Sequence, residues 1–587
     1  MQRSVNSSGS GVLASVPFHC LVILLGTAFI LTGAFHGNIW FDESYSVAIA
    51  SHSFQEIWRI GSGDVHPVLY YWALHVLYLL FGQNILVYRL FTMAGTVCFS
   101  LLGLLIVRRD FGWHVGLLFS TLSLFLPYVA YIAVEIRMYS WASFCVALCS
   151  LMAWRIASVL RSQRAGEGEH GWFSVVGQAA WWKGSCTWAG VPCRWWVAFF
   201  LSSLAAAYLH YYGVLSAFLI NLFLLVFIVK HCLTQRRAGE KLPFAPLGVL
   251  LFGAVVEVLL YLPWLLVLLT QVGVVSSGTY WSDVQFPRTL IEWLLYPVYT
   301  SHIVFADHSG WQYVVLAYCA GTLAVLALVV AAVQLVLRLR KNRAWALSSG
   351  RPVLGRWTRM KRWILQRPGA MAAVMGLLLY FGVLGFAVVA SVAMDTLIVY
   401  YRYLSVAICG LILAVSVLVA AIPNRKVVGA LVVALLAAAI TSQSIFVQDA
   451  YSEGNQEPLD WFMESLAEYS EEAGAQIPVI STDIGFEGVT SVLYPDVHQV
   501  YLDWQQGNWD LAYQAYAPTL GITKMWQDEL PGYTGKFILL SQARSNCETA
   551  EVAELLKDSG IEMVDTRTYY RQYERTWFTV SVMEKVG

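Results

Sequence analysis

Long apolar runs separated by short polar segments occupy the first three quarters of the chain. Eleven of these runs are predicted to be helices, and most of them approach the roughly 20 residues that a helix needs to cross the apolar core of a bilayer. They lie at 17–36, 85–107, 114–132, 137–160, 195–209, 212–230, 245–267, 312–337, 370–393, 404–422 and 427–446. The pattern therefore predicts a polytopic α-helical membrane protein with about 11 transmembrane helices.

A further apolar run, at 67–82, decides the orientation of the chain, because a spanning helix there would reverse every later loop. With the N-terminus inside and this run not spanning, 24 of the Lys and Arg residues among residues 1–446 fall inside and 5 outside. Positive residues favour the cytoplasmic side of a membrane. We therefore predict an interfacial helix at 67–82 in the first outer loop, an inside N-terminus and an outside C-terminus.

Charge divides the chain into two predicted domains. Hydrophobic residues make up 58% of the 587 residues and charged residues 13%, which is typical of membrane proteins. Residues 1–446 carry 29 Lys and Arg against 14 Asp and Glu, whereas residues 447–587 carry 8 against 23. We expect a transmembrane catalytic domain over 1–446 and an acidic extracytoplasmic domain over 447–587. Strand-like runs at 477–485, 536–541 and 577–585 and helix-like runs at 457–474 and 548–560 predict a small α/β fold for this second domain.

The first outer loop carries the densest candidate chemistry. The segment WFDESY places Asp42 and Glu43 directly after the first span, and DVHP places Asp64 and His66 before the predicted interfacial helix. A charge beside the bilayer is costly unless it faces water, a metal or a charged ligand. Asp42 and Glu43 are the predicted catalytic acids, although acids also stabilise a helix N-terminus. Asp64 and His66 either bind the acceptor or a divalent metal cation, or cap the helix that begins at Pro67.

A second set of candidates lies at the outer ends of later spans. Arginine suits phosphate because its planar guanidinium presents several N–H donors, and cations at this level would stabilise a departing lipid phosphate. For each arginine the alternative is an interfacial anchor, and for His210 it is a polar residue in a turn. The predicted residues for binding the phosphate and sugar of a donor are Arg89, Glu135, Arg137, Tyr139, His210, Arg402 and Tyr403.

Taken in order, these motifs resemble those of the GT-C superfamily of membrane glycosyltransferases, and most closely the group of protein O-mannosyltransferases and the lipid A aminoarabinose transferase. The resemblance covers most of residues 15–425. It rests on WFDESY at 40–45, DVHPVLYYW at 64–72, YRLFTMAG at 88–95, EIRMYSW at 135–141, YLHYYG at 208–213, YLPWL at 261–265 and YRYLSV at 401–406. Val68 stands where a second proline is common in this group.

The resemblance implies a polyprenyl-phosphate sugar donor bound between the spans and open to the outer side. It implies that Asp42 acts as base or positions the acceptor, with Glu43 as its motif partner, and that Arg89, Arg137 and Arg402 lie near the donor phosphate. A divalent metal occurs in some members of the group. The expected partners are this donor, a cell-surface acceptor (protein, lipid or wall glycan) and the lipid bilayer of the cytoplasmic membrane, with no nucleic acid.

Two other classes of function compete with this interpretation. A lipid or glycan transporter predicts polar residues or broken helices near mid-bilayer in repeated halves. Glu257 is the residue that falls deep within a span, and the other polar groups gather at one face. A non-catalytic membrane scaffold would instead act through the acidic tail.

Overall fold

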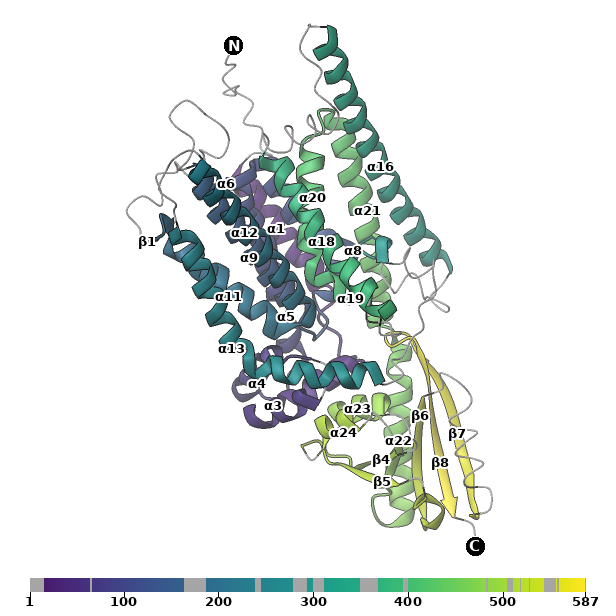
Figure 1. Ribbon diagram of the computed structural model, residues 1–587. Helices are drawn as coiled ribbons and strands as arrows, with labels where there is room; N and C mark the ends of the chain where they lie inside the picture. The colour runs from purple at the N-terminus through teal and green to yellow at the C-terminus, as the bar shows by residue number, and fades with distance from the viewer. Residues whose placement is uncertain are drawn as a thin grey trace.

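The computed structural model of the chain is mostly helical, with a mixed β-sheet near its C-terminus (Figure 1). It describes residues 15–585 except 64–65, 163–185, 238–243, 278–292, 299–310, 349–367, 394–397, 399, 482–483, 504–509, 518, 527, 543–555 and 557–558.

Eight helical segments of the described chain are long and apolar enough to cross a membrane. They are formed by α5 (Ile85–Leu102) continued by η2 (Gly103–Val107) and α6 (Arg108–Phe111), α9 (Tyr139–Ser162), α12 (Tyr211–Arg237), α13 (Phe244–Ser277), α16 (Trp311–Ser348), α18 (Pro368–Ala393), α19 (Tyr401–Leu404) continued by η4 (Ser405–Ala407) and α20 (Ile408–Ala420), and α21 (Arg425–Ala450). Three shorter apolar helices coincide with the remaining predicted spans: α1 (Val16–Leu31), α7 (Trp113–Phe125) and α11 (Cys193–Leu209). The predicted polytopic helical fold is confirmed.

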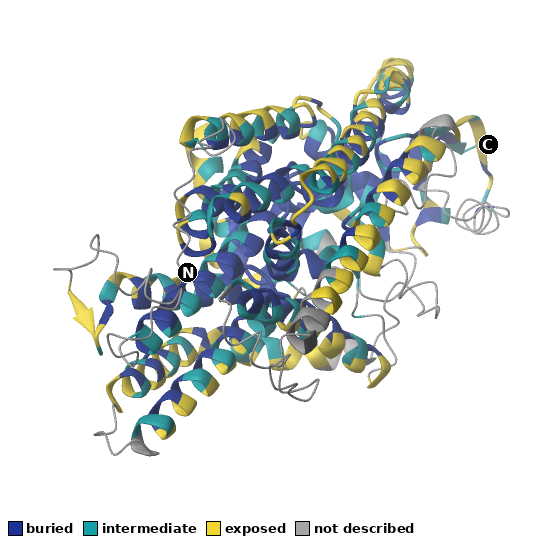
Figure 2. Cartoon of the chain, turned by 90° about the horizontal axis from the view of Figure 1, so that it is seen from above, coloured by how far each residue is buried: buried dark blue, intermediate teal, exposed yellow. Residues whose placement is uncertain are grey.

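Burial separates central from peripheral helices. Within the spanning window of α9, 72% of the residues are buried, against 22% for α13 and 28% for α16. Seen from above, the exposed faces lie on the outer helices around a buried centre (Figure 2). The exposed side chains of α13 include Leu251, Phe252 and Val255. A helix that exposes such side chains is stable where lipid surrounds it, so α13 and α16 form part of the lipid-facing surface.

The segment predicted as the first outer loop, and called by that name below, folds into three short helices, α2 (Phe41–Ala50), α3 (Phe54–Gly63) and α4 (Leu69–Phe81). The helix predicted over 67–82 is present as α4. Its apolar stretch is shorter than those of the eight spanning segments. α3 and α4 lie at the end of the helix bundle where the C-terminal sheet also lies (Figure 1). The side to which this end points remains a prediction from the positive-inside count.

The C-terminal part, here called the C-terminal unit (residues 457–585), is an α/β fold as predicted. Its six strands are hydrogen-bonded in the order β5-β4-β3-β6-β8-β7, with β3 to β6 parallel and β8 antiparallel to both β6 and β7. The elements are α22 (Glu457–Ala473), β3 (Val479–Ser481), α23 (Ile484–Leu493), β4 (Gln499–Asp503), α24 (Asp510–Tyr516), β5 (Ile522–Trp526), β6 (Lys536–Gln542), β7 (Ile561–Arg571) and β8 (Thr576–Lys585). The helix predicted over 548–560 lies largely outside the described residues.

The C-terminal unit packs directly on the first outer loop. α23 and α24 both contact α2. The Ser44 and Tyr516 hydroxyls are 2.8 Å apart, and His52 Nε2 lies 2.8 Å from the carbonyl oxygen of Ala515. α21 continues to Ala450, beyond the predicted boundary at 446. The division into two domains therefore remains a prediction, and the two parts share one buried contact surface.

Among the membrane helices, one buried ion pair offers a test of the packing. Arg155 of α9 binds Asp110 of α6 through two hydrogen bonds of 2.8 and 2.9 Å, and both side chains are almost fully buried. Removing one partner leaves the other charge uncompensated, which costs roughly 3–5 kcal/mol. We expect Asp110→Ala to lower the midpoint of thermal unfolding in detergent strongly. The double variant Asp110→Ala/Arg155→Met should recover much of the loss, and a double variant no more stable than Asp110→Ala would contradict this account.

Candidate active site at the first outer loop

The two adjacent acids of WFDESY lie in the first turn of α2 and make different contacts. Successive residues of an α-helix point about 100° apart, so neighbouring side chains face different parts of the protein. Asp42 is directed to arginines from α19 and from the segment before α9, whereas Glu43 is directed to α5 and to the C-terminal unit. The adjacent acids therefore have separate surroundings.

Asp42 lies between two arginines. Its Oδ2 is 2.6 Å from Arg402 Nη1 and 3.9 Å from Arg137 Nη2, with all three side chains largely buried. Burial alone would raise the pKa of Asp42, but the charges of Arg402, Arg137 and His66 outweigh it and hold this pKa below its usual range. Asp42 is therefore a carboxylate near neutral pH.

Arg137 is the centre of the surrounding hydrogen bonds. Its Nη1 donates to the Asp42 carbonyl oxygen (3.3 Å), the Ser46 hydroxyl (3.4 Å) and the Tyr71 hydroxyl (3.4 Å), and its Nη2 lies 3.1 Å from His66 Nε2. The structure thus brings His66 to the same site as Asp42. Asp64 lies outside the described residues. In the described part of the chain, no group of three or more His, Cys, Asp or Glu side chains is placed to hold a metal ion, so the metal role of Asp64 and His66 remains a prediction.

Close packing of α5 against α9 fixes the segment that carries Glu135 and Arg137. A Cβ atom at Gly95 would lie 2.9 Å from the backbone nitrogen of Trp141, so only glycine allows this approach. Trp141 Nε1 donates to the Phe91 carbonyl oxygen at 2.9 Å across the same contact. The motif around 88–95 therefore positions the motif around 135–141.

Glu135 is a buried acid of unusual environment. Its side chain is almost fully buried, close to the charged residues of the Asp42 cluster. Burial, with added repulsion from Asp42 and Glu43, exceeds the attraction of Arg402 and Arg137 and raises the pKa of Glu135 to about 8. At pH 7 this group is mostly a neutral carboxyl, which can donate a hydrogen bond.

Aromatic side chains surround Arg402. Its guanidinium lies 5.4 Å from the ring of Trp40, 5.0 Å from that of Tyr400 and 5.8 Å from that of Tyr403, within cation–π range. Tyr403 in turn lies beside Tyr139, with ring centroids 6.4 Å apart. This aromatic wall lies next to the ion pairs of Asp42.

His210 joins the same wall from the break between α11 and α12. A Cβ at Gly213 would overlap the Ala206 carbonyl oxygen, so glycine is needed for this tight break. The His210 ring lies 5.5 Å from that of Tyr139 and 5.3 Å from that of Tyr403. Burial and the neighbouring positive charges hold the pKa of His210 well below its usual value. Its Nδ1 accepts the Tyr212 backbone N–H at 3.1 Å, which assigns the remaining proton to Nε2.

Glu43 and Arg89 form a second, fully buried pair, 3.4 Å apart. Arg89 also donates to the carbonyl oxygens of His36 and Asn38. The side chain of Arg89 is fully buried and its terminal nitrogens are all engaged, so this geometry favours an anchor for the loop before α2. The predicted contact of Arg89 with the donor phosphate finds no support in this arrangement.

Several buried polar atoms of the site form no hydrogen bond with the described residues. They are Trp40 Nε1, Arg137 Nε and the Tyr139 hydroxyl. Buried polar groups are usually satisfied, and groups left unsatisfied carry an energetic cost. A set of unsatisfied donors around Arg402 is therefore suited to a polar ligand rich in acceptors.

Sequence inspection missed Ser46, Tyr71 and Tyr573. Tyr71 lies in the DVHPVLYYW motif and could have been included on that ground. Tyr573 lies in no motif, and its hydroxyl donates to Glu43 Oε2 at 2.7 Å across a separation of 530 residues. No local signal in the sequence points to that contact.

Comparison with known proteins gives a likeness at the level of structure. No protein-family model matches this sequence, and no curated protein matches it significantly. The chain is similar to two crystal structures of ArnT from Cupriavidus metallidurans, one bound to undecaprenyl phosphate and one in the apo state. The former has 12% identity and a TM-score of 0.48 and covers 97% of this chain and 98% of that chain. The latter has 13% identity and the same TM-score, with 96% and 97% covered.

The raised pKa of Glu135 predicts a pH-dependent loss of stability. In the unfolded chain this acid ionises near pH 4.5, whereas in the folded protein it ionises near pH 8. Unfolding therefore releases a proton between these values, and folding becomes less favourable as pH rises through this window, by a few kcal/mol in total at roughly 1.4 kcal/mol per pKa unit. We expect Glu135→Gln to unfold at the same temperature as the wild type near pH 4 and at a higher temperature near pH 8.5. Parallel pH profiles for the two proteins would refute the proposed protonation state.

Proposed function

We propose that this protein transfers a sugar from a polyprenyl-phosphate donor to a hydroxyl group of a cell-surface acceptor, at the outer side of the cytoplasmic membrane. The observation that carries the proposal is the position of Asp42 between Arg402 and Arg137 at one end of an apolar helix bundle. This transfer needs a base that accepts the proton of the acceptor hydroxyl and cations that stabilise the departing phosphate, and these three side chains can supply both.

The two arginines provide the phosphate site. A donor phosphate placed between Arg402 and Arg137 would bring acceptor oxygens to guanidinium groups that now contact Asp42. Arg137 Nε and the Tyr139 hydroxyl, which are unsatisfied among the described residues, are further donors for the phosphate and sugar. When the phosphate pairs with the two arginines, their positive charges stabilise the carboxylate of Asp42 less. The pKa of Asp42 therefore rises, and Asp42 becomes a stronger base.

The transfer step then follows from the charges. The acceptor hydroxyl oxygen forms a bond to the anomeric carbon, its proton passes to Asp42, and the bond from the anomeric carbon to the phosphate oxygen breaks. The phosphate leaves with the electron pair of that bond, stabilised by Arg402 and Arg137. Glu135, neutral at pH 7, can donate a hydrogen bond to the sugar without placing a negative charge beside the phosphate.

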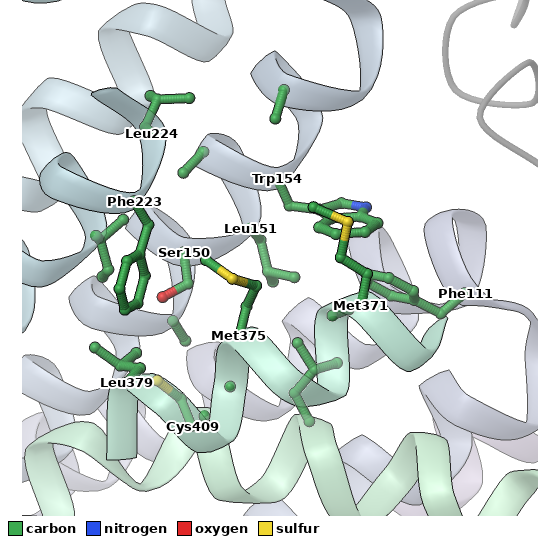
Figure 3. A pocket seen from close by; sticks show the side chains of 18 of the residues that line it. Phe111, Ser150, Leu151, Trp154, Phe223, Leu224, Met371, Met375, Leu379 and Cys409 are labelled. Atoms are coloured by element: carbon green, nitrogen blue, oxygen red, sulfur yellow. The ribbon is translucent and has the colours of Figure 1, made fainter. Parts of the chain in front are cut away.

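The distribution of polar groups favours transfer over transport. Inside the bundle, a cavity lies between α9, α12, α18 and α20 (Figure 3). Its lining is almost entirely apolar and includes Phe223, Met371 and Met375, and the hydroxyl of Ser150 is a polar group in this lining. A transporter for a polar glycan requires polar contacts along its path through the membrane. The charged groups around Asp42 are instead concentrated at one end of the bundle, and the one other buried pair described above, Asp110 with Arg155, is an ion pair closed on itself.

The direct test is transfer by the purified full-length protein from labelled polyprenyl-phosphate sugars. We expect Asp42→Asn to lower kcat by about 100-fold or more, because a positioned general base contributes roughly 10²–10⁴ to a rate. The matched control is Glu56→Gln, since Glu56 is an exposed acid of α3 that pairs with Arg59. The control should retain wild-type activity. Wild-type protein that neither transfers nor hydrolyses any donor, or Asp42→Asn with unchanged activity, would refute the proposal.

A further inference from the structure

The turn that joins β7 to β8 reaches from the C-terminal unit into the candidate site. β7 ends at Arg571 and β8 begins at Thr576, and the Arg575 backbone N–H donates to the Arg571 carbonyl oxygen at 2.8 Å. Arg575 has a positive φ of 56°, as the turn requires. The hydroxyl of Tyr573 in this turn donates to Glu43 Oε2 at 2.7 Å, and both side chains are buried.

Contacts on both sides of Tyr573 hold the turn in place. Arg575 forms an ion pair with Asp449 at 2.6 Å, and Arg571 Nη2 donates to Asn38 Oδ1 at 3.3 Å. The backbone N–H of Tyr573 donates to Asn455 Oδ1 at 2.9 Å, and its ring lies 4.7 Å from that of His36. Because the turn is anchored by these groups, the direction of the Tyr573 hydroxyl is set independently of Glu43.

Glu43 transmits this contact to the catalytic segment. Its Oε1 accepts the backbone N–H of Ile136 at 3.1 Å, while its Oε2 accepts Arg89 and Tyr573. Ile136 stands between Glu135 and Arg137, and Arg137 contacts Asp42. A carboxylate with fewer donors on Oε2 can rotate, and rotation lengthens the bond from Oε1 to Ile136.

We infer that Tyr573 is a positioning residue through which the C-terminal unit completes the active site. By holding Glu43, its hydroxyl holds the backbone at 135–137 and thereby the arginine that faces Asp42. The C-terminal unit then contributes a residue that positions the site, in addition to packing against it. The effect on transfer rests on the proposed function, whereas the effect on the backbone at 135–137 does not.

The test compares two tyrosine hydroxyls at the same contact surface in the full-length protein. Tyr573→Phe removes the bond to Glu43, and Tyr516→Phe removes a bond of 2.8 Å to Ser44 that involves no acid. Hydrogen–deuterium exchange is measured for the peptide that contains Ile136. We expect this peptide to exchange about five-fold faster in Tyr573→Phe, because one hydrogen bond contributes about that factor, and at the wild-type rate in Tyr516→Phe.

Transfer kinetics provide the second measurement. We expect Tyr573→Phe to lower kcat about ten-fold while KM for donor and acceptor changes by less than two-fold, and Tyr516→Phe to leave both unchanged. A wild type without transfer activity, combined with faster exchange in Tyr573→Phe, would refute the proposed function but support the positioning role. Unchanged exchange at Ile136, or equal effects of the two variants, would overturn the positioning role itself.

A variant at the other end of the contact covers the case in which Tyr573→Phe does not fold. Glu43→Gln keeps the shape of the side chain and weakens it as an acceptor for Tyr573, Arg89 and Ile136. The Ile136 peptide should again exchange faster than in the wild type. Wild-type exchange in Glu43→Gln would contradict the role assigned to Tyr573.

Discussion

The placement of the Asp42 carboxylate between Arg402 and Arg137 is the constraint on which the rest of the site depends. Charges with little access to water must be paired, because an uncompensated buried charge costs several kcal/mol. The three residues come from α2, from the segment before α9 and from α19, so this pairing requires three separate parts of the chain to meet at one point. The pairing contributes little net stability, but it defines where the helix ends lie relative to one another.

A second network holds the first in place. Glu43, one residue after Asp42, binds Arg89, the Ile136 backbone and Tyr573, and none of its carboxylate contacts involves Arg402 or Arg137. Of the two adjacent acids, Asp42 is thus directed to the two arginines of the candidate site and Glu43 to the surrounding scaffold. Because of this division, the terminal nitrogens of Arg89 contact the carbonyl oxygens of His36 and Asn38 and the carboxylate of Glu43, whereas those of Arg137 contact Asp42 and His66.

The candidate site is polar, whereas the interior of the described bundle next to it is apolar. The cavity between α9 and α18 is apolar, and the exposed faces of α13 and α16 are suited to lipid chains. The polar groups of the site lie where the first outer loop, the helix ends and the C-terminal unit meet. Such an arrangement matches a substrate with a long apolar chain and a charged head, since each part finds a suitable environment.

The sequence by itself determined the membrane helices, because hydropathy over about 20 residues is a local property that does not depend on the fold. It also selected most of the charged residues of the candidate site, since a charge beside an apolar run is conspicuous wherever the chain later folds. Asp42, His66, Arg137 and Arg402 were selected on this ground, and the structure brings them together. In the C-terminal unit, α22, β3, β6 and β8 were predicted, whereas α23, α24 and the strands β4 and β5 were not.

Only the tertiary structure decided which partner each charged residue takes. Whether Arg89 faces a ligand or a carbonyl oxygen, and whether Glu135 is ionised or neutral, depends on groups that are distant in sequence and on burial, which no local pattern records. Tyr573 is the clearest case. Its hydroxyl reaches Glu43 from 530 residues away, because a turn of the C-terminal sheet packs against the first outer loop. Contacts of this kind arise from the packing of whole elements, and the residues that make them carry no distinguishing mark in the sequence.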